Sequence, residues 1–90
     1  MSPKAQQSRE ALAKFNAEIA ALKGDDLLDR KLAFDRLPPP LKSERNLRRA
    51  QAYTLGAALM NAFGVGNWTK ALAERRDRAA ATESGSPRLP

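Results

Sequence analysis

The chain has 90 residues, of which 42% are hydrophobic, enough for one small domain but not for two. Seventeen alanines and twelve leucines supply most of that share, and Ile19 and Val65 are the only β-branched aliphatic residues. Because alanine and leucine favour helices and sheets need β-branched and aromatic residues, the composition excludes an all-β fold and predicts an all-α domain.

Two absences limit the chemistry that the chain can carry. The sequence has no cysteine and no histidine, so it lacks thiolate metal ligands, a cysteine nucleophile and the commonest general base. We therefore expect no enzyme activity and predict no catalytic, cofactor or metal site. The polar N-terminal stretch and the lack of an apolar run of roughly 18 residues predict a cytoplasmic protein with no membrane association.

The net charge of +6 is unevenly distributed along the chain. Residues 1–40 hold seven basic and six acidic residues, whereas residues 41–90 hold nine basic and four acidic ones. A positive second half favours an anionic partner, either nucleic acid or an acidic protein surface. Charge alone does not choose between these two.

The first predicted helix covers about residues 3–23, with Ser2 and Pro3 typical of a helix start and Gly24 of a helix end. Its apolar residues recur every three or four positions and form a narrow seam. The seam residues are Ala5, Leu12, Phe15, Ile19 and Leu22. Ser8 stands between the first two, at the position where the spacing would place another apolar residue. This seam predicts packing on the domain's own core; the alternative is a coiled-coil contact that joins two copies as a homodimer.

A second, shorter helix is predicted over about residues 26–37. Asp25 and Asp26 precede it, and the helix dipole favours acids at that end. The three prolines Pro38–Pro40 then fix the backbone and lack N–H donors, so the second helix must end before them. We interpret them as a stiff corner between two pairs of helices.

The second half of the chain predicts two more helices. The third covers about residues 44–63 with Ser43 as its cap, and it is apolar on most sides, which is typical of a central helix. The fourth covers about residues 68–81. Residues 82–90 offer little to bury, so we predict one helical domain over residues 1–81 and a disordered tail after it.

Two groups of side chains are candidate binding sites. If the third and fourth helices are antiparallel neighbours, their basic residues form one patch that could hold the phosphates of nucleic acid. These residues are Arg45, Arg48, Arg49, Lys70, Arg75, Arg76 and Arg78. A bulky apolar group at one corner could instead bind a protein, because exposed methionine and aromatic residues are adaptable contacts. Its members are Tyr53, Leu55, Met60, Phe63 and Trp68.

The stretch between the third and fourth helices has some features of a DNA-reading helix-turn-helix. With Gly64 at the turn, Phe63 and Val65 fall at inward positions, but Lys70 and Met60 occupy places where that motif needs buried or small residues. We therefore expect a small regulatory protein that binds another protein, for example an inhibitor or antiactivator of a transcription factor or nucleic-acid machine. The alternative is a basic helical DNA-binding protein, such as a repressor or accessory factor.

Overall fold

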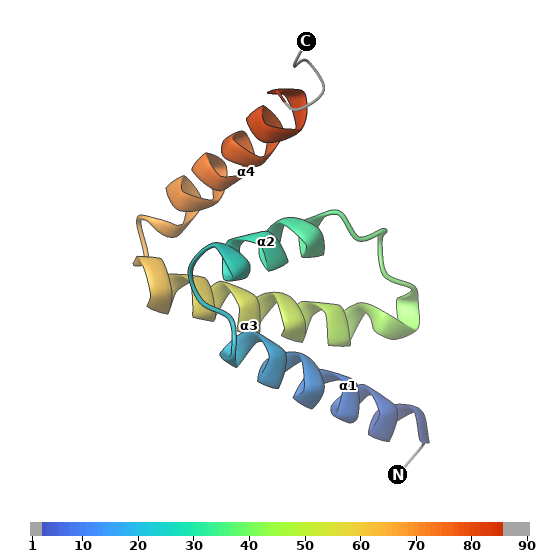
Figure 1. The fold of residues 1–90 in the computed structure, drawn as a ribbon. Helices are drawn as coiled ribbons and strands as arrows, with labels where there is room; N and C mark the ends of the chain where they lie inside the picture. The colour runs from blue at the N-terminus through green and yellow to red at the C-terminus, as the bar shows by residue number, and fades with distance from the viewer. Residues whose placement is uncertain (1–2, 86–90) are drawn as a thin grey trace.

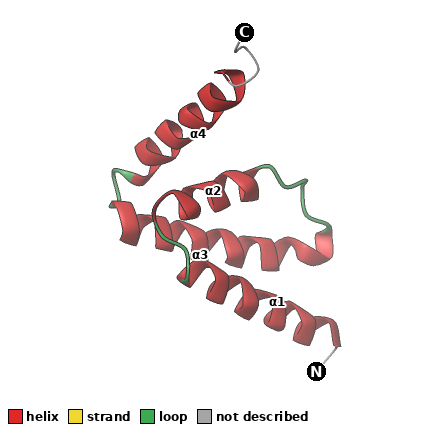
Figure 2. Ribbon diagram, viewed as in Figure 1, coloured by secondary structure: helices red, strands yellow, loops and turns green. Residues whose placement is uncertain are grey.

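The computed structural model describes residues 3–85, and within this range it contains four α-helices, one 3₁₀ turn and no strand. The predicted all-α bundle is confirmed, and Figure 2 shows its helices joined by short loops. None of these helices is both long and apolar enough to cross a membrane. The helices are α1 (Pro3–Ala20), α2 (Gly24–Asp35), α3 (Arg45–Phe63) and α4 (Trp68–Gly85), and the 3₁₀ turn is Lys42–Glu44.

The hydrophobic core lies where the first three helices meet. In Figure 1, α3 runs between α1 and α2, so the prediction of a central third helix is confirmed. The buried side chains of the described residues come in pairs from these helices: Phe15 and Ile19, Leu27 and Leu28, Leu55 and Leu59. α4 adds only half-buried contacts at one edge, through Trp68, Ala71 and Leu72. The core is therefore built by three helices, with the fourth attached at its side.

The apolar seam of α1 packs against α3. Phe15 and Ile19 are buried and Leu12 is half-buried, whereas Ala5 is exposed near the start of the helix. The helix ends at Ala20, three residues before the predicted end. A homodimer through the seam stays a prediction, and it would have to compete with α3 for the two buried side chains.

The boundaries of α2 lie two residues earlier than predicted. Gly24 has a φ of 55°, a left-handed conformation that glycine adopts without strain, and it begins the helix. The helix ends at Asp35 rather than at residue 37. Leu37 precedes Pro38, and the proline ring crowds the backbone of the residue before it, which disfavours the helical conformation there.

The start of α3 corrects one predicted contact. Ser43 does not cap the helix; it lies inside the 3₁₀ turn, and α3 begins at Arg45. The Oε1 atom of Glu44 instead accepts a hydrogen bond of 3.1 Å from the backbone N–H of Leu41. The N–H of Glu44 in turn donates to the carbonyl oxygen of Leu41 at 2.8 Å, so this pair joins the proline corner to α3.

One face of α3 is exposed, which corrects the expectation that the helix is buried on most sides. Tyr53 is 82% exposed and Met60 is 39% exposed. They lie seven residues apart, about two helical turns, and therefore share a face. Gly56 lies between them, and a Cβ atom there would meet nothing within 4 Å outside its own helix. No described helix approaches Gly56 closely.

The turn after α3 sends α4 away from it. Gly64 has a φ of 96°, and its N–H donates to the carbonyl oxygen of Met60 at 2.8 Å. α4 leaves the C-terminal end of α3 at an angle and packs against α2 (Figure 1). It reaches Gly85, four residues beyond its predicted end. Ser2, the predicted cap of the first helix, and residues 86–90 of the predicted tail lie outside the described residues.

Candidate functional site

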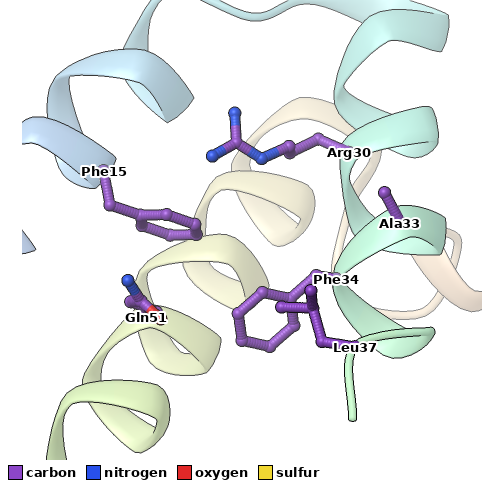
Figure 3. Close-up of a pocket in the computed structure, with 6 residues that line it drawn as sticks. All are labelled: Phe15, Arg30, Ala33, Phe34, Leu37 and Gln51. Carbon is purple, nitrogen blue, oxygen red and sulfur yellow. The ribbon is translucent and has the colours of Figure 1, made fainter.

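An open groove of about 260 Å³ lies where α1, α2 and α3 meet. In Figure 3, the rings of Phe15 from α1 and Phe34 from α2 lie on its two sides, and Arg30 reaches across one end. Leu37, just after α2, is 47% exposed at the other end, so the groove offers apolar surface to solvent. The lining residues are Phe15, Arg30, Ala33, Phe34, Leu37 and Gln51.

The aromatic residues of the groove also take part in the hydrophobic core, Phe15 as a member and Phe34 as a residue packed against it. Phe15 is buried, and its ring centroid lies 5.9 Å from that of Phe34 at a tilted angle of 52°. Such tilted ring pairs are favourable contacts in addition to the area that they bury. The backbone N–H of Leu37 donates to the carbonyl oxygen of Phe34 at 3.2 Å, which holds Leu37 beside the ring.

Cationic side chains surround the two rings. The guanidinium carbon of Arg30 lies 5.0 Å from the Phe15 ring centroid, and that of Arg48 lies 5.8 Å from the Phe34 centroid. Lys31 approaches Phe34 as well, at 5.9 Å. These distances are within the range of cation–π attraction. Arg30 Nη2 also donates to Glu18 Oε1 at 2.8 Å, and this hydrogen bond lowers the pKa of the Glu18 carboxyl.

The groove lies in the most positive part of the chain. Residues 30–49 contain seven basic and two acidic residues, a net charge of +5 out of +6 for the whole chain. They cover the second half of α2, the proline corner and the first turn of α3. The exposed basic residues of this segment are Arg36, Lys42, Arg45 and Arg49. We refer to residues 30–49 as the basic segment.

A second polar cluster joins α2 to α4. Arg75 donates to the Asp29 carboxylate from Nε at 2.7 Å and from Nη2 at 3.0 Å. Arg78 donates to Asp25 from Nη1 at 3.1 Å and from Nη2 at 3.3 Å. These hydrogen bonds hold the pKa values of Asp29 and Asp25 below those of ordinary aspartates. The pairs join the first half of α2 to the middle of α4.

We expect this cluster to make stability depend on pH. The two carboxyls have pKa values in the folded protein below the value of about 3.9 in the unfolded chain. Their contribution to the stability of the fold is therefore complete above about pH 3.9 and is lost as the pH falls through the lower pKa values of the folded protein. The double variant Asp25→Asn/Asp29→Asn should therefore melt below the wild type at pH 7, and the gap should close towards pH 2. Thermal unfolding followed by circular dichroism measures this gap. A gap that stays constant across this pH range would contradict the predicted contribution.

The predicted apolar site is divided between the core and the surface. Leu55 is fully buried, so a partner cannot reach it in this fold, and the predicted site is corrected at this residue. Phe63 and Trp68 are half-buried and pack against the core. Of the five residues predicted for this site, only Tyr53 and Met60 are exposed, and both lie on the open face of α3.

The two predicted basic clusters do not form one patch. Arg45 and Arg49 are exposed near the start of α3, whereas α4 leaves the opposite end of that helix (Figure 1). The antiparallel arrangement on which the single patch depended is therefore wrong. Arg75 and Arg78 face the acids of α2, and the more exposed Arg76 lies within 4.0 Å of Asp77.

The connection between α3 and α4 departs further from a DNA-reading motif. Phe63 packs inward, as the motif requires, but Val65 is 75% exposed. Lys70 is exposed as well. On the exposed surface of α4, Lys70 and Arg76 alternate with Glu74 and Asp77, which reduces the attraction to phosphates.

Several important residues were not singled out as site residues from the sequence. Arg30, Ala33, Phe34 and Gln51 line the groove, and Phe15, which lines it too, was interpreted only as a residue of the seam that packs on the core. The sequence held one signal for the ion pairs. Asp25 and Asp29 are four residues apart and Arg75 and Arg78 are three apart, so each pair lies on one face of its helix. No comparable signal in the sequence joins the three helices that form the groove.

Comparison with protein-family models, with curated proteins and with solved structures gave no match to this chain.

Proposed function

We propose that the chain is a small, non-enzymatic regulatory protein that acts in the cytoplasm by binding another protein. An inhibitor or antiactivator of a transcription factor or nucleic-acid machine would have this character. The proposal rests on the open groove between α1, α2 and α3, with its two phenylalanine rings and its exposed Leu37. The lack of histidine and cysteine supports the non-enzymatic part, because it removes the commonest general base and the strongest side-chain nucleophile.

The groove has the features of a site for a partner's side chain. Each Å² of exposed apolar surface that a partner covers contributes roughly 25 cal/mol of favourable free energy from its removal from water. A few anchors that enter well-packed pockets carry most of the energy of a protein interface. Phe15 and Phe34 are already held by the core, so a partner would not have to order them on binding.

DNA binding is the second candidate, and one observation favours it. A short turn of residues 64–67 joins α3 to α4, the connection length that helix-turn-helix units use. Against it, Arg75 and Arg78 are engaged with Asp29 and Asp25, and Val65 is exposed. We expect the wild-type protein to bind random duplex DNA only weakly and with strong dependence on salt.

Affinity capture from native lysate, with and without nuclease, separates the two candidates. We expect a partner protein to stay bound to the immobilised wild-type chain after nuclease treatment, because the contact is between proteins. An unrelated basic protein of similar size and charge is the control for retention by charge alone. Loss of every captured protein on nuclease treatment, together with tight binding to one DNA sequence at physiological salt, would contradict the proposal.

A further inference from the structure

We infer that the groove receives an apolar side chain from an acidic segment of the partner protein. This inference rests on the proposed function and specifies the chemistry of the partner at that site. Two features carry it: an apolar groove of limited volume, and the concentration of positive charge in the residues that surround it.

The size of the groove fits one anchoring side chain. A cavity of about 150 Å³ is sufficient for a benzene ring, and this groove has a volume of about 260 Å³. Its apolar walls come from Phe15, Ala33, Phe34 and Leu37. A leucine or phenylalanine side chain of the partner would bury its surface against these walls.

Two arginines near the rings of the groove supply donors for carboxylates next to the anchor. Arg30 lines the groove and lies over the Phe15 ring, whereas Arg48 lies over the Phe34 ring, and each guanidinium has five N–H donors. In the described contacts, Arg30 uses Nη2 for Glu18, and Arg48 uses Nη1 for the carbonyl oxygen of Pro38. The geometry of the guanidinium suits carboxylates, which it can bind through two parallel hydrogen bonds.

The wider charge distribution favours an acidic segment over a small anionic molecule. Exposed Arg36, Lys42, Arg45 and Arg49 extend the positive surface along the basic segment, beyond the residues that line the groove. A small ligand would occupy the groove alone, whereas a segment with several acids on each side of its anchor would also be attracted by these residues.

The aromatic rings argue against single-stranded nucleic acid as the occupant. Bases bind such proteins by stacking on exposed ring faces. Phe15 is only 7% exposed, and Arg30 lies over its ring. Phe34 is half-buried and has Lys31 and Arg48 near its ring. A base would have to stack on rings that already have cations over them, whereas an apolar side chain can also contact Ala33 and Leu37, which are exposed in the groove.

The test measures binding of a short fluorescein-labelled peptide by fluorescence anisotropy. The peptide consists of aspartate and glutamate with one central leucine. We expect saturable binding that weakens with salt, and at least tenfold weaker binding when serine replaces the leucine, because the apolar side chain then no longer covers the apolar walls of the groove. A peptide with lysine in place of the acids should not bind.

Two variants of the protein assign the binding to the groove. Arg30→Gln and Arg48→Gln should each weaken peptide binding about threefold to tenfold. Arg76→Gln removes the same charge from the exposed surface of α4 and should leave binding almost unchanged. Equal losses in all three variants would mean that net charge alone holds the peptide, and the inference would be overturned. So would tighter binding of a labelled oligothymidylate that depends on the same two arginines.

The outcome separates this inference from the proposed function. If the acidic peptide does not bind but nuclease-treated lysate still yields a captured protein, the partner uses another surface and the inference fails alone. If nothing is captured either, both fail.

Discussion

Replacement of Leu59 by alanine is expected to lower the free energy of unfolding by about 2–5 kcal/mol, the usual range for a buried leucine. Leu59 has no exposed surface and lies on the face of α3 that meets the other core residues. Its truncation removes apolar contacts and leaves a cavity that neighbouring helices fill only in part. Domains of this size are modestly stable, so this loss is a large part of the total. Urea unfolding followed by circular dichroism measures it.

Two further variants keep this prediction testable if Leu59→Ala does not fold. Leu59→Met roughly conserves volume and should cost less than about 1.5 kcal/mol. Tyr53→Ala removes a large side chain from the exposed face of the same helix and should change stability by no more than about 0.5 kcal/mol. If Leu59→Ala cost less than about 1 kcal/mol, Leu59 would not be a core residue and α3 would have to be rotated about its axis.

The helices could be predicted from the sequence because their signals are local. The start of α3 lies one residue from its predicted position and its end coincides with it, since a long apolar pattern stops at Gly64, which has a positive φ. The seam of α1 identified Phe15 and Ile19 as core residues through their helical spacing alone. Other helix ends were less well predicted: α1 ends at Ala20, before the predicted position, and α4 extends to Gly85, beyond it.

The position of α4 could not be predicted because no local pattern sets the angle between two helices. The turn after Phe63 fixes only where α3 ends. The contacts of α4 with α2 join Asp29 to Arg75 and Asp25 to Arg78, residues that lie 46 and 53 positions apart in the chain. Because α4 packs there and not along α3, the predicted basic patch does not form, and Tyr53 stays exposed.

The groove could not be predicted either, because no local pattern shows how separate helices pack together. Its two rings belong to the first and second helices, and no pattern in the sequence relates one ring to the other. The charge around it was hidden as well, because dividing the chain at Pro40 assigns Arg30 and Arg36 to a nearly neutral first half. Counting the charge over residues 30–49 instead places them with Arg45 and Arg48 in one basic segment.

A bulky residue inside the groove is expected to abolish partner binding without unfolding the protein. Ala33 is an exposed residue of α2 that lines the groove, so the indole of Ala33→Trp would fill the space that a partner's side chain needs. The substitution costs only a fraction of a kcal/mol in helix propensity, and circular dichroism checks that the helices are kept. Ala80→Trp places the same side chain on an exposed site of α4 and serves as the matched control.

Capture from nuclease-treated lysate with these two variants and the wild type as bait is the most direct test of the groove as the functional site. We predict that the wild type and Ala80→Trp retain the same partner protein and that Ala33→Trp loses it. Retention of that partner at equal levels by all three baits would contradict a function located in the groove.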